Sequence, residues 1–270
     1  MIIELQDGSR IDTYEHSMRR LFHYIPSITV EHQREAVDGR RGLVVTDSSF
    51  TERMITVEFI YESYDIEDFY LLRDELNAIF ARDDWFYIIF KNEPYKKYKV
   101  RMNGSINLPP NMFMEQFQVE FLCDDIYALS IYPTSKFKKE WDIDMFAWNN
   151  SITWDEEPQY NFNTNHFQVY NLGTTDVDPR QDYLKITLEG MFTSQVVIIN
   201  NTTGETYTCN TSLSSGDKLV LDGIKSTKNG QSVFRHTNKR LLKLRRGIND
   251  FTISGGVVTN ISFDFNFLYL

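Results

Sequence analysis

The sequence predicts a mainly β protein: an α+β amino-terminal domain, in which a β-sandwich carries one packed helix, followed by a β-sandwich of the jelly-roll type. Aromatic residues make up 14% of the 270 residues, and aromatic side chains favour strands. Strand patterns surround a single helical pattern in the first 130 residues, whereas only strand patterns recur from about residue 166 onward. We therefore predict a first domain over residues 1–132, a connector over 133–165 and a second domain over 166–270.

The predicted helix of the first domain covers residues 66–82. Asp65 is a suitable N-cap residue, with Asp68 three positions later. The apolar residues that recur at helical spacing are Ile66, Phe69, Leu72, Leu76, Ile79 and Phe80. Apolar and polar residues alternate over 55–61 before the helix, and over 98–102 and 113–121 after it, which is typical of strands with one covered face.

The second domain is predicted from short strand patterns that are separated by turn residues. Its apolar or alternating runs cover residues 167–170, 183–188, 195–199, 218–221, 241–244 and 257–269. Asn229-Gly230 has the composition of a two-residue hairpin turn, because both central positions of that turn need positive φ. Ser254-Gly255-Gly256 is predicted to be a turn before the last strand. This spacing indicates an all-β sandwich or jelly roll.

Length, charge and cysteine content narrow the class of protein. The 28 Lys and Arg against 38 Asp and Glu give a net charge of −10, which argues against nucleic-acid binding. The amino terminus lacks a basic stretch followed by an apolar one, and the longest apolar run, 85–90, is too short to span a membrane, so we expect neither secretion nor a membrane anchor. Cys123 and Cys209 lie in strand-like surroundings without a CxxC motif, and we expect both to be buried free thiols.

The sequence contains no recognisable catalytic, cofactor-binding or metal-binding motif. Histidines at positions 16, 23, 32, 166 and 236 lack metal-ligand spacing, and GxSxG, GxGxxG and phosphate-loop motifs are missing. The adjacent carboxylates at 83–84, 124–125 and 156–157 would point to opposite faces of a strand, which does not suit a glycosidase pair. Asp176, Asp178 and Asp182 resemble part of a calcium loop, but Pro179 and Arg180 interrupt it. We therefore assign no catalytic, cofactor or metal residue and expect no enzyme activity.

Two clusters leave alternatives open. Six basic residues lie between positions 235 and 246: Arg235, Lys239, Arg240, Lys243, Arg245 and Arg246. They favour a solvated face or a protein interface over a nucleic-acid site, because the chain as a whole is acidic. The connector is rich in tryptophan, and Trp148 or Trp154 could stack on sugar rings; anchoring of one domain on the other is the commoner use of such residues.

The order of these features resembles the distal tail protein family of long, non-contractile-tailed bacteriophages. In the first half, the similarity lies in the Arg-led strand 53–61, the helix with the sequence DFYLLRDELNAIF and the segment FQVEFLCDDIYALS at 117–130. In the second half, it lies in VYNLG at 169–173, SGDKLVLDG at 215–223, NGQ at 229–231 and RRGIND before the terminal FDFNFLYL. The resemblance covers nearly the whole chain.

Membership of this family would imply a structural virion protein at the tail tip. Members form a homo-hexameric ring that joins the tail tube protein to the tail-associated protein and to receptor-binding or baseplate proteins, and DNA passes through without specific binding. The first domain would build the ring, and the second would be a galectin-like sandwich. Assembly would take place in the bacterial host cytoplasm.

From the residues we add a hypothesis about the ring contact. The polar, glycine-containing stretch Glu31–Gly42 suits a projecting hairpin rather than a core strand. The candidate contact residues are Glu31, His32, Arg34, Val37, Arg40 and Arg41. We also expect an acidic lumen that repels DNA phosphates. The alternative function is a carbohydrate-binding module that engages host cell-wall sugars through Trp148 or Trp154.

Overall fold

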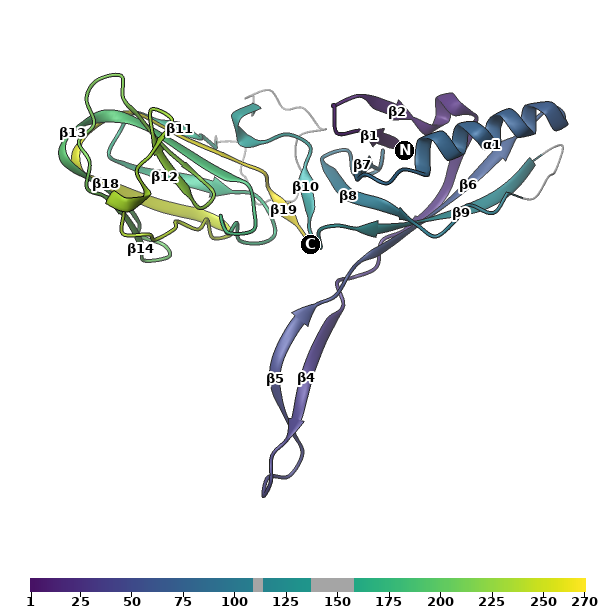
Figure 1. Cartoon of the computed structure of the whole chain (residues 1–270), viewed down its shortest axis with the longest axis horizontal. Helices are drawn as coiled ribbons and strands as arrows, with labels where there is room; N and C mark the ends of the chain where they lie inside the picture. The colour runs from purple at the N-terminus through teal and green to yellow at the C-terminus, as the bar shows by residue number, and fades with distance from the viewer. Residues whose placement is uncertain (109–113, 137–157) are drawn as a thin grey trace. The chain divides into compact units, whose positions relative to one another are not determined.

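The computed structural model describes residues 1–108, 114–136 and 158–270 (Figure 1). The chain divides into two compact units, Met1–Ala128 with Leu270, and Leu129–Tyr269. Large antiparallel sheets form most of both units, which confirms the predicted mainly β class. The proposed connector 133–165 lies largely outside the described residues.

The amino-terminal unit is built on one antiparallel sheet with the strand order β2-β1-β7-β8-β9-β6-β3. Its strands are β1 (Ile2–Glu4), β2 (Arg10–Asp12), β3 (Met18–Tyr24), β6 (Met54–Glu62), β7 (Phe86–Ile89), β8 (Lys96–Asn103) and β9 (Met114–Cys123). A short 3-10 helix, η1 (Thr13–His16), links β2 to β3. Two further strands, β4 (Val30–Ala36) and β5 (Leu43–Phe50), pair with each other.

The helix α1 (Ile66–Phe80) lies along this sheet, as Figure 1 shows. The Asp65 carboxylate accepts a 2.8 Å hydrogen bond from the amide of Asp68, which confirms the predicted N-cap. The helix ends two residues before the predicted end. Its buried side chains are Phe69, Leu72, Leu76, Ile79 and Phe80. The Phe80 ring lies 5.8 Å from the rings of Phe59 and Phe121, so the predicted apolar face packs on β6 and β9.

The carboxy-terminal unit contains a second antiparallel sheet with the path β11-β18-β13-β15-β16-β17, in which β12 also pairs with β18 and β14 with β13. Its strands are β11 (Asn161–Phe162), β12 (His166–Asn171), β13 (Leu184–Asn200), β14 (Glu205–Cys209), β15 (Lys218–Asp222), β16 (Lys225–Lys228), β17 (Gln231–Ser232) and β18 (Gly247–Phe265). β10 (Ala128–Ser130) pairs with β19 (Leu268–Tyr269). The short 3-10 helices are η2 (Thr134–Lys136) and η3 (Phe234–His236).

Two long strands, β13 and β18, organise this unit. They pair along almost their full length, with register shifts after Glu189 and between Phe192 and Val197. The first part of β13 also pairs with β15 and its last part with β14. Similarly, β18 pairs first with β12 and later with β11. The shifts therefore lie where each long strand exchanges one partner for another, as β-bulges do in folded-over sheets.

The turn at Asn229-Gly230 is as predicted, because both residues have positive φ (50° and 81°) and join β16 to β17. The runs 183–188 and 195–199 were expected to form two strands, but they are parts of the single strand β13. The prediction of a turn at Ser254-Gly255-Gly256 is also wrong, since these residues lie within β18. The predicted strand 241–244 forms no regular strand: only Leu244 makes an isolated bridge, with Val177.

Candidate functional site

The β4–β5 hairpin is the candidate assembly surface. Its register runs from Val30 opposite Phe50 to Ala36 opposite Leu43, with one bulge. The connecting loop turns through Gly39 and Gly42, whose φ values are 80° and 88°. In the described part of the chain, β4 and β5 pair with no other strand, and they stand out as a separate two-stranded ribbon in Figure 1.

The hairpin is almost entirely exposed. All seven residues of β4 are exposed, and Val44 is the only residue of β5 that is partly covered. Five apolar side chains are about half exposed or more: Val30, Val37, Leu43, Val45 and Phe50. A lone two-stranded hairpin in water is at best marginally stable, and adjacent exposed apolar residues are typical of a surface that another protein covers.

All six candidate contact residues lie on this hairpin. Glu31, His32 and Arg34 belong to β4, and Val37, Arg40 and Arg41 belong to the loop. The Nδ1 atom of His32 lies 2.8 Å from Oγ of Ser48 on the facing strand. Residues 31–42 therefore form the first strand and the loop of a hairpin whose second strand is β5, and the contact role of these residues stays a prediction.

Sequence reasoning missed the second half of the hairpin and the strand that leads into it. Leu43, Val45 and Phe50 on β5 are exposed, as are Phe22 and Tyr24 on β3, which forms one edge of the amino-terminal sheet. Apolar residues in a strand normally indicate a core position, so only the lack of regular alternation in LVVTDSSF pointed away from the core. An edge strand with exposed main-chain groups offers a site for pairing with another chain.

In the described residues, four of the five histidines, His16, His23, His32 and His166, contact other side chains. His16 Nδ1 is 2.5 Å from a carboxylate oxygen of Glu75, and His166 Nε2 is 3.0 Å from Asp250. His23 stacks on Phe90 at 4.1 Å and contacts Arg20. Burial, reinforced by the charge of Arg20, lowers the pKa of His23. Residues 1–108, 114–136 and 158–270 contain no cluster of three or more side chains that could hold a metal ion.

The aspartates that resemble a calcium loop bind main-chain amides instead. Asp176 accepts from the amide of Arg246 at 2.8 Å, and Asp182 from the amide of Asp178 at 2.7 Å. Asp178 accepts from the amide of Arg180 and pairs with Lys243 Nζ at 2.7 Å. These contacts fix a loop that precedes β13.

Both cysteines are free and buried, as expected. Burial raises the pKa of the Cys123 thiol to about 12. Among the carboxylates that are adjacent in the sequence, Asp124 forms an ion pair with Arg101 at 2.8 Å. Glu156, Glu157 and the tryptophans Trp148 and Trp154 lie outside the described residues.

The six basic residues between 235 and 246 are spread over η3 and the extended segment that follows it. Lys243 pairs with Asp178, whereas Arg235, Arg240, Arg245 and Arg246 are exposed. The exposure of these arginines agrees with the expected solvated face, while a protein interface stays a prediction. No helix in the described ranges has the length and apolar character needed to cross a membrane.

Comparison with known proteins points to phage tails. Residues 7–123 match the family model of the phage tail protein RIFT-related domain. The chain is similar to the crystal structure of the Dit protein of phage SPP1, described as a paradigm of the hub adsorption apparatus in phages that infect Gram-positive bacteria. That similarity has a TM-score of 0.69 at 15% identity and covers 98% of both chains.

Two structures of the phage p2 baseplate in its activated conformation, with Sr and with Ca, match at 10% identity with a TM-score of 0.47, over 98% of this chain and 96% of theirs. No curated protein sequence matches the chain. Residues 7–123 thus match the phage tail protein RIFT-related domain, and the chain as a whole has the fold of the SPP1 Dit protein.

Proposed function

We propose that this chain is a non-enzymatic hub protein of a phage tail tip, and that six copies close into a ring. The ring would join the tail tube protein to the tail-associated protein and to receptor-binding or baseplate proteins. The main support is the similarity to the SPP1 hub protein along 98% of both chains. Because that identity is 15%, the likeness establishes the fold, and the role is our inference from it.

The hairpin supplies a physical reason for a ring. A closed ring needs two different surfaces on each subunit, so that one surface meets the other on the next copy. The exposed apolar residues of β4–β5 provide one such surface, and the exposed edge strand β3 offers main-chain groups for another. In this proposal Glu31, His32, Arg34, Val37, Arg40 and Arg41 contact the neighbouring subunit.

The net charge of −10 suits a conduit for DNA, because an acidic lumen repels phosphate groups and keeps the duplex from binding. Two buried free thiols suit assembly in the reducing host cytoplasm before incorporation into the virion.

The experiment measures solution mass and incorporation into tails. A hexamer has a mass of about 190 kDa, six times the 31.9 kDa of one chain. Deleting residues 37–42, or introducing Leu43→Asp with Phe50→Asp, is expected to prevent both the hexamer and incorporation into tails, because charge on a buried interface is costly.

A matched control places the same charges on exposed apolar residues of the other unit, Ile224→Asp with Val257→Asp. Circular dichroism checks that each variant is folded. The ring-contact proposal fails if the folded hairpin variants still form hexamers or still enter tails as efficiently as this control.

A further inference from the structure

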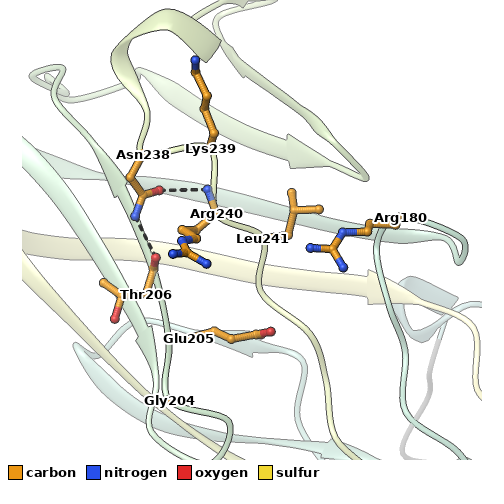
Figure 2. Close-up of a pocket in the computed structure, with 8 residues that line it drawn as sticks. All are labelled: Arg180, Gly204, Glu205, Thr206, Asn238, Lys239, Arg240 and Leu241. Atoms are coloured by element: carbon orange, nitrogen blue, oxygen red, sulfur yellow. Dashed lines mark hydrogen bonds between the residues drawn. The ribbon is translucent and has the colours of Figure 1, made fainter.

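A polar cavity of about 610 Å³ opens on the carboxy-terminal unit (Figure 2). Three of its lining residues are cations, one is a carboxylate, and only one has an apolar side chain. The lining consists of Arg180, Gly204, Glu205, Thr206, Asn238, Lys239, Arg240 and Leu241. The excess of positive charge stands out on a chain whose net charge is −10.

Hydrogen bonds around Asn238 fix the main chain that carries two of these cations. The Asn238 side chain donates to the carbonyl oxygen of Thr206 at 2.8 Å and accepts from the amide of Arg240 at 3.2 Å (Figure 2). Its own amide donates to the carbonyl oxygen of Thr208 at 3.0 Å. Lys239 adopts a left-handed conformation with φ of 58°. The segment is therefore held against β14 before any ligand binds, which lowers the entropic cost of binding.

In the described residues, two of the three cations of the cavity, Lys239 and Arg240, form no ion pair. Arg180 forms a long ion pair of 3.8 Å with Asp178, whose carboxylate also binds Lys243 at 2.7 Å. In the described residues the Arg240 guanidinium has no ion pair or hydrogen bond, and Lys239 Nζ lies 5.9 Å from the centre of the Phe234 ring. Cations without a carboxylate partner suit an anionic ligand, and arginine binds phosphate oxygens in a bidentate manner.

Glu205 adds a carboxylate hydrogen-bond acceptor to the cations of the cavity. Its Oε2 atom accepts a 2.6 Å hydrogen bond from the amide of Lys243 and a 3.3 Å bond from Thr203. In the described residues, Oε1 makes no hydrogen bond, so it can accept one from a ligand hydroxyl group. A carboxylate beside three cations favours a ligand that carries both negative charge and hydroxyl groups.

We propose that this cavity binds the phosphate ester of a sugar or polyol. Arg180, Lys239 and Arg240 pair with the phosphate oxygens, and Glu205 accepts from a hydroxyl group. Single-stranded nucleic acid fits less well, because no lining residue is aromatic and the carboxylate opposes a densely charged strand. An acidic peptide fits less well, because the cavity has only Leu241 for an apolar anchor.

Two sources share this chemistry: a phosphodiester-linked sugar or polyol polymer of a cell surface, and a free sugar phosphate. Calorimetric titration of the full chain with an oligomer of poly(glycerol phosphate) and with glycerol 3-phosphate distinguishes them. If the chain binds the oligomer at least about tenfold more tightly than glycerol 3-phosphate, the ligand is the polymer. If the two affinities are equal, the ligand is the free ester.

Arg180→Ala with Arg240→Ala is expected to weaken binding of the phosphate probes by at least about tenfold. The matched control, Arg245→Ala with Arg246→Ala, removes the same charge from exposed residues that do not line the cavity and is expected to stay within about twofold. Glu205→Gln is expected to weaken glycerol 3-phosphate relative to inorganic phosphate, because a weaker hydroxyl acceptor replaces the carboxylate.

The proposal is overturned if neither phosphate probe binds, or if the control loses as much affinity as the cavity variant. Equal or tighter binding of an acidic peptide or of oligo(dT) also overturns it, as does an equal effect of Glu205→Gln on glycerol 3-phosphate and inorganic phosphate. These outcomes are independent of the hub role, since each probe binds to the chain itself.

Discussion

Gly256 lies directly against the main-chain carbonyl of Met191, so that a Cβ atom on residue 256 would stand 2.1 Å from that oxygen. The Phe192 ring would be 2.7 Å away from the same atom. Only glycine therefore fits where β18 crosses the bend of β13.

Gly256→Ala is expected to lower the free energy of unfolding by about 3 kcal/mol or more, because main-chain atoms must move. Gly230→Ala is the control: nothing lies within 4 Å of the added Cβ, and the positive φ alone costs about 1 kcal/mol. Chemical denaturation measures both variants, and equal losses would contradict the close approach.

The N-cap of α1 provides a second prediction. Asp65→Ala is expected to destabilise the amino-terminal unit by about 1 kcal/mol, since the Asp68 amide loses its acceptor. Asp65→Asn retains a capping oxygen, so it is expected to destabilise the unit by only about a few tenths of 1 kcal/mol. If both variants unfold at the same denaturant concentration as the unmodified chain, the cap contributes nothing.

Glu4 makes stability depend on pH. Burial alone would raise its pKa, but hydrogen bonds and charges from Lys97 and Arg10 lower the pKa overall. A carboxyl group with a lowered pKa in the folded state stabilises the fold above its unfolded pKa, and this contribution is lost as the pH falls through the folded value.

Glu4→Gln is therefore expected to lower the free energy of unfolding by roughly 1 kcal/mol at pH 7 and by less at pH 3. Unfolding measured at both pH values tests this. The ion pairs do not have this role if the variant loses the same amount at both. Lys97→Met is the complementary variant, because it removes one of the two cations that pair with Glu4.

The two thiols are expected to react slowly in the folded chain. The raised pKa of Cys123 leaves almost no thiolate at pH 8, and Cys209 is 1% exposed. A thiol reagent such as DTNB should modify two groups rapidly only after denaturant is added. Rapid reaction of either thiol in the folded protein would show that its strand opens.

The hairpin is expected to change its hydrogen exchange on assembly. Its main-chain hydrogen bonds are exposed, so amides of residues 30–50 should exchange quickly in the monomer, and those of β6 slowly. Protection of residues 30–50 in the assembled ring, by about tenfold or more, is the outcome that the ring-contact proposal requires. Unchanged exchange in a ring of confirmed mass would contradict it.

Sequence patterns correctly predicted those elements that depend on interactions between residues close together in the sequence. The Asp65 cap and the apolar face of α1 could be read from the sequence, as could the Asn229-Gly230 turn, because each depends on residues that are neighbours along the chain. Exposure could be predicted only partly. The polar stretch 31–42 indicated a hairpin, but the apolar residues of β5 resemble those of a core strand, since the sequence does not show what covers them.

The failures occurred where distant segments decide the structure. Ser254-Gly255-Gly256 has the composition of a turn, yet these glycines allow β18 to continue past a bend of β13 that is about 60 residues away in sequence. Segment 241–244 has strand composition, but it is held by one bridge to Val177 and by the Glu205 carboxylate. The cavity is lined by residues from three segments that are distant in sequence. Of these, only the basic residues between 235 and 246 stand out in the sequence.

The long strands β13 and β18 have a consequence for how the carboxy-terminal unit comes apart. Every other strand of that sheet's path is attached, directly or through β15, to one of these two. No group of these strands can therefore separate from the others without breaking hydrogen bonds to β13 or β18. The unit should melt in a single all-or-none step, so that it stays intact until the global unfolding threshold is reached.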